Sequence, residues 1–377
     1  MSSSLRICFI VNEYPVKGKV GGFGTLTRDL AKGLTARGWD ICVLVPRHKE
    51  IAANIQKNIE FVDGIPIFTI PSNFKGKLEN KAVYKLIDAD IYHSEDVIYD
   101  SYFAAKWSKK GAKHIVTFQD PPTFEDLWML ETTRNEGHSK LKKFKWRIKF
   151  ALRHMVFMKY IKRCDGFFSE AKFLIDKSKK MFNIKEKIGF LPNPVNIPKR
   201  KMKKARSPTV CFLGRWDTQK RPWLFFDLAK KFPKVIFIAM GQPQENVEWL
   251  KDFKKKYGNL KNLQMPGFVS ESEKSKILEK SWALVSTSVR EGLPVAFLEA
   301  LAHETPIISF VNPDKLPEKF GFWAKTENFE DGLEWLLQSK EWRLKGKKGR
   351  KYVETWHAYD RVLEMHEKVY QEILSQH

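Results

Sequence analysis

The chain has 377 residues, more than one typical hydrophobic core organises, so two domains are expected. Hydrophobic residues make up 43% of it, which excludes an intrinsically disordered protein. The formal net charge of +23 favours anionic partners, such as nucleic acid, an acidic bilayer or a phosphorylated lipid or sugar, although a general lysine excess that improves solubility explains much of it.

The cysteines and the apolar runs indicate the cellular compartment in which the protein is expected. The four cysteines are scattered without paired spacing, so neither a disulfide framework nor a zinc site is expected, and a reducing cytosol fits. The apolar run before Asn12 predicts a buried strand rather than a signal peptide. No run approaches the roughly 20 apolar residues of a membrane span. We therefore expect a cytoplasmic protein, soluble or peripheral on the inner face of the membrane.

The N-terminal pattern predicts a βαβ unit. Residues 5–11 and 39–46 read as strands and residues 25–37 as a helix, with a glycine-rich loop over 17–24. That loop follows the first strand, where ligands bind in open α/β sheets. It lacks the G-x-G-x-x-G spacing, and no acidic residue ends the second strand, so a dinucleotide fingerprint is excluded.

Residues 59–70 predict a hairpin around Asp63 and Gly64. The triplet at 88–90 has the form of a metal-binding DxD, but it precedes a strand, so we interpret it as a turn and assign no metal. A helix over 97–109 and a strand over 113–120 follow.

The segment 138–163 predicts a basic amphipathic helix. Lys142, Lys145, Lys149 and Arg153 share one side, and an apolar side includes Ile148, Leu152 and Met155. One interpretation is a helix resting on anionic lipid, with Trp146 and Phe150 inserted. The other is a helix whose apolar side packs on the core and whose basic side is solvated. No recognised motif supports specific nucleic-acid binding.

A strand over 166–170, a helix over 171–181 and a strand over 187–196 end the first domain. Residues 197–208 are polar and basic, which is typical of a linker. A strand over 209–216 opens the second domain, and Arg215 and Lys220 stand at its carboxyl end. Two cations there would clamp a diphosphate, and the less favoured alternative is that Lys220 is one of many surface lysines.

The rest of the second domain alternates strands and helices. Strands are expected at 234–241 and 263–270 and helices at 245–257 and 271–280. Weaker βα units cover 307–340, and a final helix covers 359–375.

The stretch 288–309 carries the strongest signal. It predicts a strand over 283–287, a loop, a helix opening near Pro294 and a strand over 306–310. Glu291 lies in the loop and Glu299 on the helix, with seven residues between them. The helix N-terminus offers amides to an anion, and the two carboxylates offer acceptors for hydroxyl groups. This combination describes a nucleotide-sugar pocket.

This stretch resembles the E-x7-E signature of retaining family 4 glycosyltransferases. A bare pair of glutamates is common by chance, but the whole string EGLPVAFLEALAHETPIIS is far more specific. The resemblance implies the α/β GT-B fold, two Rossmann-like doubly wound domains facing a central cleft. The domains would be 1–198, with 357–377 packing back on it, and 208–356, joined by a linker over 199–207.

The resemblance also implies roles for particular residues. Glu291 would contact hydroxyls of the transferred sugar, Glu299 would accept from the ribose, and Arg215 and Lys220 of the G-R-x4-K element would hold the leaving diphosphate. Asp120 would meet the acceptor hydroxyl. The remaining donor-binding residues would be Gly21, Gly22, Gln119, Gly241, Val269, Gly292, Leu293, Pro294 and Val295.

Three departures from the family pattern stand out. Gln119 occupies the slot of a frequent histidine and cannot act as a general base, Pro194 and Asn196 replace a glycine and an aspartate, and Arg221 replaces the glycine after the lysine.

The function that the resemblance implies is retaining transfer of a sugar, of hexosyltransferase type, from a nucleotide-diphosphate sugar to a hydroxyl of a lipid-linked or cell-envelope glycan. No cofactor or metal is expected. The partners would be the nucleotide sugar, the glycan or lipid-linked acceptor and an anionic membrane surface, with no specific nucleic acid. A GT-B nucleotide-sugar epimerase and a noncatalytic nucleotide-sugar-binding protein are the alternatives.

Overall fold

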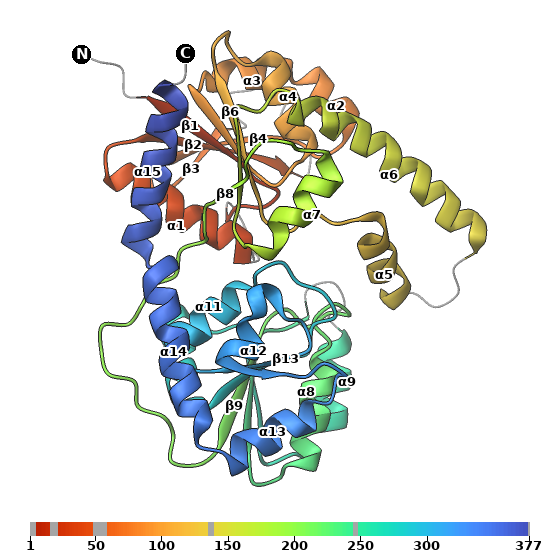
Figure 1. The fold of residues 1–377 in the computed structure, drawn as a ribbon. Helices are drawn as coiled ribbons and strands as arrows, with labels where there is room; N and C mark the ends of the chain where they lie inside the picture. The colour runs from red at the N-terminus through yellow and green to blue at the C-terminus, as the bar shows by residue number, and fades with distance from the viewer. Residues whose placement is uncertain (1–4, 16–21, 48–58, 135–138, 244–247, 376–377) are drawn as a thin grey trace. The chain divides into compact units, whose positions relative to one another are not determined.

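The computed structural model describes residues 5–15, 22–47, 59–134, 139–243 and 248–375. Its contacts group the chain into two compact α/β units (Figure 1). Unit 1 comprises Met1–Phe124, Ser139–Pro194 and Asp360–His377, and unit 2 comprises Glu125–His138 and Val195–Tyr359. The segment Glu125–His138 therefore belongs to unit 2, although the residues on both sides of it in the sequence belong to unit 1. The C-terminal helix belongs to unit 1.

Unit 1 is built on an eight-stranded sheet of order β3-β4-β2-β1-β5-β6-β7-β8. All neighbouring strands are parallel except β3 and β4. The central strands are almost wholly buried, as strands covered on both faces of a sheet must be. The strands are β1 (Arg6–Ile10), β2 (Asp40–Arg47), β3 (Ile59–Val62), β4 (Ile65–Pro71), β5 (Ile91–Glu95), β6 (Lys113–Phe118), β7 (Gly166–Ser169) and β8 (Gly189–Phe190).

The helices of unit 1 pack on this sheet around a core that includes Tyr84, Tyr92 and Phe103. They are α1 (Gly22–Ala36), α2 (Phe74–Glu79), α3 (Lys81–Ile87), α4 (Tyr99–Trp107), α6 (Lys140–Ile161), α7 (Phe173–Phe182) and α15 (Tyr359–Ser375). Helix α15 is tied to this unit by Glu367, which pairs with Arg37 at 2.8 Å and accepts from Trp39 Nε1 at 3.1 Å.

Unit 2 is built on a six-stranded, wholly parallel sheet of order β11-β10-β9-β12-β13-β14. Its core is rich in aromatic side chains, among them Trp216, Phe225 and Phe237. The strands are β9 (Thr209–Leu213), β10 (Ile236–Met240), β11 (Leu263–Gly267), β12 (Ala283–Ser286), β13 (Ile307–Ser309) and β14 (Gly321–Trp323). The helices are α5 (Phe124–Arg134, whose first residue is grouped with unit 1), α8 (Pro222–Lys231), α9 (Glu248–Tyr257), α10 (Glu271–Lys280), α11 (Val295–Ala302), α12 (Leu316–Phe320), α13 (Phe329–Gln338) and α14 (Glu341–Trp356), with a 3-10 turn at Pro313–Lys315.

Two turn predictions are confirmed. Strands β3 and β4 form the predicted hairpin, and Asp63 and Gly64 at its tip have φ values of 53° and 78°, as a tight hairpin turn requires. Residues 88–90 form a turn in which Asp88 ends α3 with φ 47° and Asp90 accepts from the Arg6 amide at 2.8 Å.

Helices α2, α3, α5 and α14 lie where the sequence predicted no element. Helices α2 and α3 have six and seven residues, too few for a helical period to show. Helix α14 is so rich in lysine and arginine that its apolar face is reduced to a few residues.

Candidate active site

Unit 2 brings two loops together where the order of its strands reverses. Strand β9 lies between β10 and β12, so the loops after β9 and β12 leave the carboxyl edge of the sheet beside each other. Ligands bind at this position in open α/β sheets. The first loop carries Lys220 and the second carries Glu291, and the Lys220 Nζ forms an ion pair with Glu291 Oε1.

Hydrogen bonds join the two loops that carry this ion pair. The Lys220 amide donates to Asp217 Oδ1 at 2.8 Å, and Thr287 Oγ1 donates to the Lys220 carbonyl at 2.6 Å. Gln219 Nε2 donates to the Arg290 carbonyl at 3.0 Å. The two loops are therefore joined by backbone and side-chain contacts, and the charged groups are held in place before any ligand arrives.

Arg221, at the position where the resembled family has glycine, adopts a conformation that favours glycine. Its φ of 49° and ψ of 54° lie in the left-handed region, at the N-cap of α8. Its Nε donates to the Thr287 carbonyl at 2.8 Å, and its Nη1 pairs with Glu327 at 2.9 Å. These contacts offset the backbone strain, so the departure from the family pattern leaves the Lys220 loop intact.

Arg215 lies on the same loop with its side chain 45% exposed. Its Nε is 3.4 Å from Asp217 Oδ2. Asp217 thus orients Arg215 while its carboxylate also caps the Lys220 amide. An anion in front of the loop can reach the Arg215 guanidinium without breaking a buried contact.

Helix α11 begins at Val295, with Pro294 as the extended N-cap residue at φ −63° and ψ 128°. Val295 and Ala296 are its first two residues, whose amides have no acceptor within a helix. Gly292 and Leu293, just before them, are buried. The predicted anion-binding amides therefore lie next to the Lys220 ion pair.

Glu299, one turn into α11, is held by a lysine that the sequence did not single out. Lys274 on α10 places its Nζ 2.5 Å from Glu299 Oε1 and 2.7 Å from Glu271 Oε1. Burial lowers the pKa of Lys274, but the two carboxylates more than offset this and the pKa is raised overall. Lys274 therefore stays charged beside the Glu299 carboxylate. No motif connects the two residues, because they lie 25 positions apart on different helices.

Gly241 and Val269 follow β10 and β11 at the same edge of the sheet. Gly241 has φ 125°, and a Cβ there would lie 1.8 Å from the Gly214 carbonyl oxygen. Its amide donates to the Gly267 carbonyl at 2.8 Å. The loops after β9, β10 and β11 can approach one another this closely only because residue 241 is glycine. Val269 is half-buried.

A second contact that the sequence did not predict lies beside Glu291. Arg290 Nε pairs with Asp126 Oδ1 of α5 at 3.2 Å, and both side chains are largely buried. Residues 125–138 belong to unit 2, so α5 supports the loop that carries Glu291. The sequence of α5 shows no clear helical pattern, so nothing in it pointed to this ion pair.

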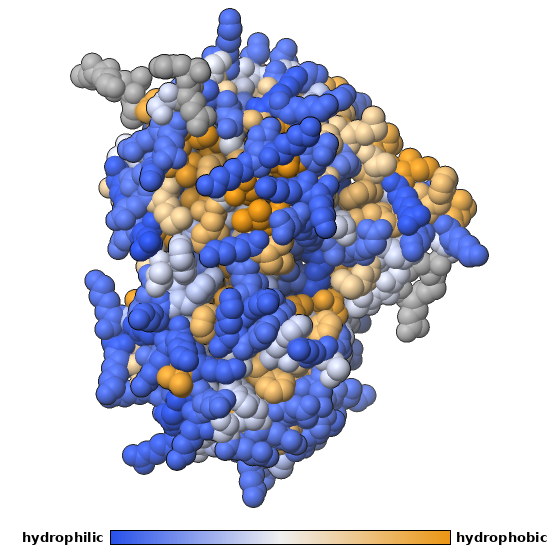
Figure 2. Space-filling view, in the orientation of Figure 1, coloured by the Kyte–Doolittle hydropathy of each residue, from blue (hydrophilic) through white to orange (hydrophobic). Residues whose placement is uncertain are grey.

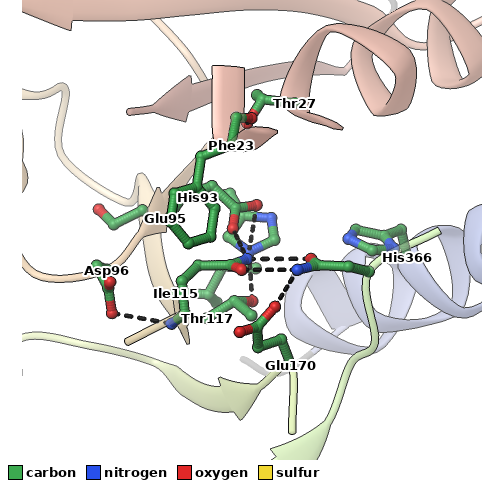
Figure 3. A network of polar contacts seen from close by, with 12 residues as sticks. Phe23, Thr27, His93, Glu95, Asp96, Ile115, Thr117, Glu170 and His366 are labelled. Carbon is green, nitrogen blue, oxygen red and sulfur yellow. Dashed lines mark hydrogen bonds and ion pairs between the residues drawn. The ribbon is translucent and has the colours of Figure 1, made fainter. Parts of the chain in front are cut away.

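In unit 1 four buried polar residues end or follow adjacent strands: Glu95, Gln119, Glu170 and Asn193. Gln119 Nε2 donates to Glu95 Oε2 and to Asn193 Oδ1, the latter at 3.2 Å. Asn193 Nδ2 donates to Gln119 Oε1 at 2.8 Å and to Glu170 Oε2 (Figure 3). The Gln119 amide is thus occupied by protein partners, and its donor-binding role stays a prediction.

Burial raises the pKa of Glu95 to about 8; the hydrogen bond from Gln119 lowers it and nearby Asp96 raises it. His93, close to Glu95, has a pKa well below the ordinary value because it is buried and faces His366. Its Nδ1 lies 2.9 Å from the Tyr370 hydroxyl of α15, and its Nε2 lies 2.7 Å from Thr117 Oγ1. A neutral His93 therefore joins the C-terminal helix to the sheet next to the network.

Asp120 and the two N-terminal glycines complete the predicted set. The Asp120 amide donates to Asp96 Oδ2 at 3.0 Å, and its Oδ1 lies 3.9 Å from Lys177 Nζ. Gly22 is the exposed first residue of α1. Gly21 lies outside the described residues.

Aromatic side chains on one face of α6 pack on the protein, contrary to the interpretation that Phe150 inserts into lipid. Phe150, expected to enter lipid, packs against Phe124 and His154 with ring centroids 5.9 and 6.2 Å away. Trp146, one turn earlier on the same face, is half-buried. Arg153 stacks over Phe150 and Phe157, at 5.3 and 5.7 Å. This face of α6 therefore packs on unit 1, whereas Lys145 and Lys149 are exposed.

The described residues contain neither a membrane-spanning helix nor a cluster of metal-binding side chains. None of their helices is both long and apolar enough to cross a bilayer. No three or more of their His, Cys, Asp and Glu side chains are grouped so that they could hold a metal ion.

Family models match most of the chain. The model described as Glycosyltransferase Family 4 matches residues 20–199, and the model described as Glycosyl transferases group 1 matches residues 196–349. A curated glycogen synthase from Clostridium beijerinckii is 28% identical over 102 residues, which are 26% of this chain. The match spans only 21% of the length of that relative.

Solved structures share the whole fold. A sucrose-phosphate synthase from Thermosynechococcus elongatus has 14% identity and a TM-score of 0.75, over 99% of this chain and 100% of that one. A glycosyltransferase from Rickettsia africae has 16% identity and a TM-score of 0.68, over 100% of both chains. Anabaena Alr3699/HepE, solved with UDP, has 14% identity and a TM-score of 0.69, over 98% and 100%. The chain belongs to the group 1, family 4 glycosyltransferases and has their GT-B fold.

Proposed function

We propose that the protein transfers a hexose from a nucleotide-diphosphate sugar to a hydroxyl group, with retention of the anomeric configuration and without a metal ion. The observation that carries this proposal is the contact between Lys220 and Glu291 at the switch point of the unit 2 sheet. A cation for the diphosphate and a carboxylate for the sugar stand side by side there. The transfer would need no cofactor.

The chemistry would be electrostatic. The acceptor oxygen attacks the anomeric carbon on the face that the diphosphate leaves, the bond from that carbon to the diphosphate oxygen breaks, and the acceptor proton passes to the leaving diphosphate. Arg215, Lys220 and the first amides of α11 would stabilise the charge that builds on the diphosphate. Glu291, released from Lys220, would orient the sugar hydroxyls. Glu299 would accept from the ribose.

Unit 1 would supply the acceptor side. Asp120 lies at the carboxyl edge of its sheet, next to the network of Glu95, Gln119, Glu170 and Asn193. We propose a lipid-linked or cell-envelope glycan as acceptor, met at the anionic inner face of a membrane. The basic residues of α6, Lys145 and Lys149 among them, support this choice because they favour an anionic surface.

The test is a product analysis. The purified chain is incubated, without metal, with UDP-glucose, GDP-mannose or ADP-glucose and with octyl glycosides as acceptors that carry a lipid-like tail. Proton NMR then follows released nucleotide and the configuration of the new bond. Nucleotide release with a retained glycosidic bond supports the proposal. An inverted bond, a new nucleotide sugar formed without acceptor, or binding without any turnover contradicts it, and the last two correspond to an epimerase and a noncatalytic protein.

A further inference from the structure

Helix α6 presents a row of apolar side chains to solvent. Leu141, Phe144, Ile148, Leu152 and Met155 are exposed by 62, 61, 47, 59 and 60%. Steps of three and four residues place them on one face of the helix, over about 21 Å of its length. Figure 2 shows the corresponding hydrophobic surface over α6 in orange. An exposed apolar row of this length marks an interaction surface rather than a scattering of single residues.

The opposite face of α6 provides its attachment to unit 1. Phe150 packs on Phe124, and Phe157 packs on Tyr99 with ring centroids 5.5 Å apart. The Tyr160 hydroxyl donates to Ser94 Oγ at 2.9 Å. These side chains lie about half a turn away from the exposed row. The row is therefore not needed to hold α6 in the fold.

The charge of α6 indicates what covers the row. Between residues 140 and 161 the helix has eight lysine and arginine residues and no aspartate or glutamate. Lys145 and Lys149 border the row on one side and Arg147 borders it on the other, from their spacing along the helix. An apolar strip bordered by cations matches the interface of an anionic bilayer, where acyl chains meet phosphate groups.

We propose that the row from Leu141 to Met155 inserts into the surface of an anionic bilayer, with α6 parallel to the membrane plane. The 22 residues of α6 are enough to cross a bilayer in length, but eight cations exclude that arrangement. Pairing of the row with a second copy of this chain would bring two sets of cations together with no carboxylate on either helix. The lipid surface thus fits the charge and the second copy does not.

The experiment measures vesicle binding by the full chain. Flotation compares vesicles of neutral phosphatidylcholine with vesicles containing phosphatidylglycerol, for the wild type and for the double variant Ile148→Ser, Leu152→Ser. Leu344→Ser is the matched control, because Leu344 is an exposed leucine, at 56%, on a helix of unit 2. We expect binding only to the anionic vesicles, a loss of at least about tenfold in the double variant, and no loss in the control. Circular dichroism confirms that the variants fold.

Two results would overturn the inference: equal binding to both kinds of vesicle, or anionic binding that the double variant retains. A dimer in sedimentation that the double variant abolishes, without vesicle binding by the wild type, would assign the row to self-association instead. The inference rests on the proposed function in one respect only, which is that the proposed acceptor lies at a membrane. Binding of a nucleoside diphosphate to the chain in solution, measured in parallel, separates a failure of this surface from a failure of that function.

Discussion

Lys274 on α10 and Glu299 on α11 form an ion pair of 2.5 Å that fixes the second glutamate of the E-x7-E signature. Both side chains are mostly buried, at 16% and 17% exposure. Removing the lysine would leave a partly buried carboxylate that has lost its nearest charge partner, which is costly. Lys274 is therefore a positioning residue for the predicted ribose contact.

The substitution Lys274→Met should raise the KM for the nucleotide sugar by roughly tenfold while kcat and the KM for the acceptor change little. Lys274→Arg should restore most of the affinity, because it keeps a cation near Glu299. Lys276→Met, at an exposed position on the same helix, is the control. An equal change in donor and acceptor KM would argue for a general structural defect rather than positioning of Glu299.

Replacement of Gly241 tests the close approach of the unit 2 loops. Gly241→Ala places a Cβ in a left-handed backbone and against the Gly214 carbonyl, so we expect a loss of about 3 kcal/mol or more in the free energy of unfolding. Gly267→Ala is the matched control, because its φ is 79° but nothing lies within 4 Å of the added Cβ. It should lose only about 1 kcal/mol. Chemical denaturation measures both, and equal losses would contradict the geometry around residue 241.

Arg221 provides a test of backbone strain. Arg221→Ala and Arg221→Gly both remove the contacts to Thr287 and Glu327, but only glycine also relieves the left-handed conformation. The glycine variant should therefore be more stable than the alanine variant by about 1 kcal/mol, as measured by chemical denaturation. If alanine proved equally stable, the conformation assigned to residue 221 would be wrong.

Glu95 should make stability depend on pH. Its pKa rises from 4.5 to about 8 on folding, because burial penalises the charged form. The unfolded chain therefore loses this proton first, and stability falls as pH rises from about 4.5 and is fully reduced above about 8. Glu95→Gln should be more stable than the wild type at pH 8, by an amount on the order of 2–4 kcal/mol, and similar to it near pH 5.

Unfolding in denaturant at pH 5, 6.5 and 8 measures this difference. Glu79→Gln, at an exposed position, is the control, and its free energy of unfolding should change with pH in the same way as that of the wild type. If the free energy of unfolding of Glu95→Gln also changed with pH as that of the wild type does, Glu95 would titrate normally in the folded state.

Arg215 should increase kcat by stabilising the charge that develops on the leaving diphosphate in the transition state. Because its side chain is 45% exposed, Arg215→Ala should fold normally, yet lower kcat by about 10²-fold or more, on the scale of losing a donor to a developing anion. Arg206→Ala, exposed in the segment before β9, is the control. Steady-state kinetics with a fixed donor would measure both, and an unchanged kcat in the Arg215 variant would remove it from the mechanism.

The sequence predicted those parts of the protein in which one local pattern decides the structure. The apolar strands, the hairpin at Asp63 and Gly64 and the loop-to-helix turn before Val295 all have such patterns, and the structure contains them. The E-x7-E string was informative for the same reason, because the motif and its helix are contiguous.

The contacts that the sequence missed join residues far apart in the chain. Lys274 reaches Glu299 across 25 positions, and Glu95 meets Gln119 across 24. Glu95, Glu170 and Asn193 each stand at or just after a strand, a signal that could have found them as a group once the strand order was known. The interpretation that Phe150 inserts into lipid was wrong, because Phe150 packs on Phe124. Helical periodicity shows that two faces differ and does not show which one the fold covers.

The proposed function requires that the loop of unit 2 that carries Lys220 and Arg215 bind the diphosphate of a nucleotide sugar. A thermal-shift titration with UDP, GDP and ADP, without added metal, tests it most directly on the wild type, Lys220→Met and Arg215→Ala. We expect one nucleoside diphosphate to raise the melting temperature of the wild type, because a ligand stabilises the state that it binds, and we expect both variants to lose most of this rise. No stabilisation of the wild type by any of the three at millimolar concentration, or an equal rise in the variants, would contradict it.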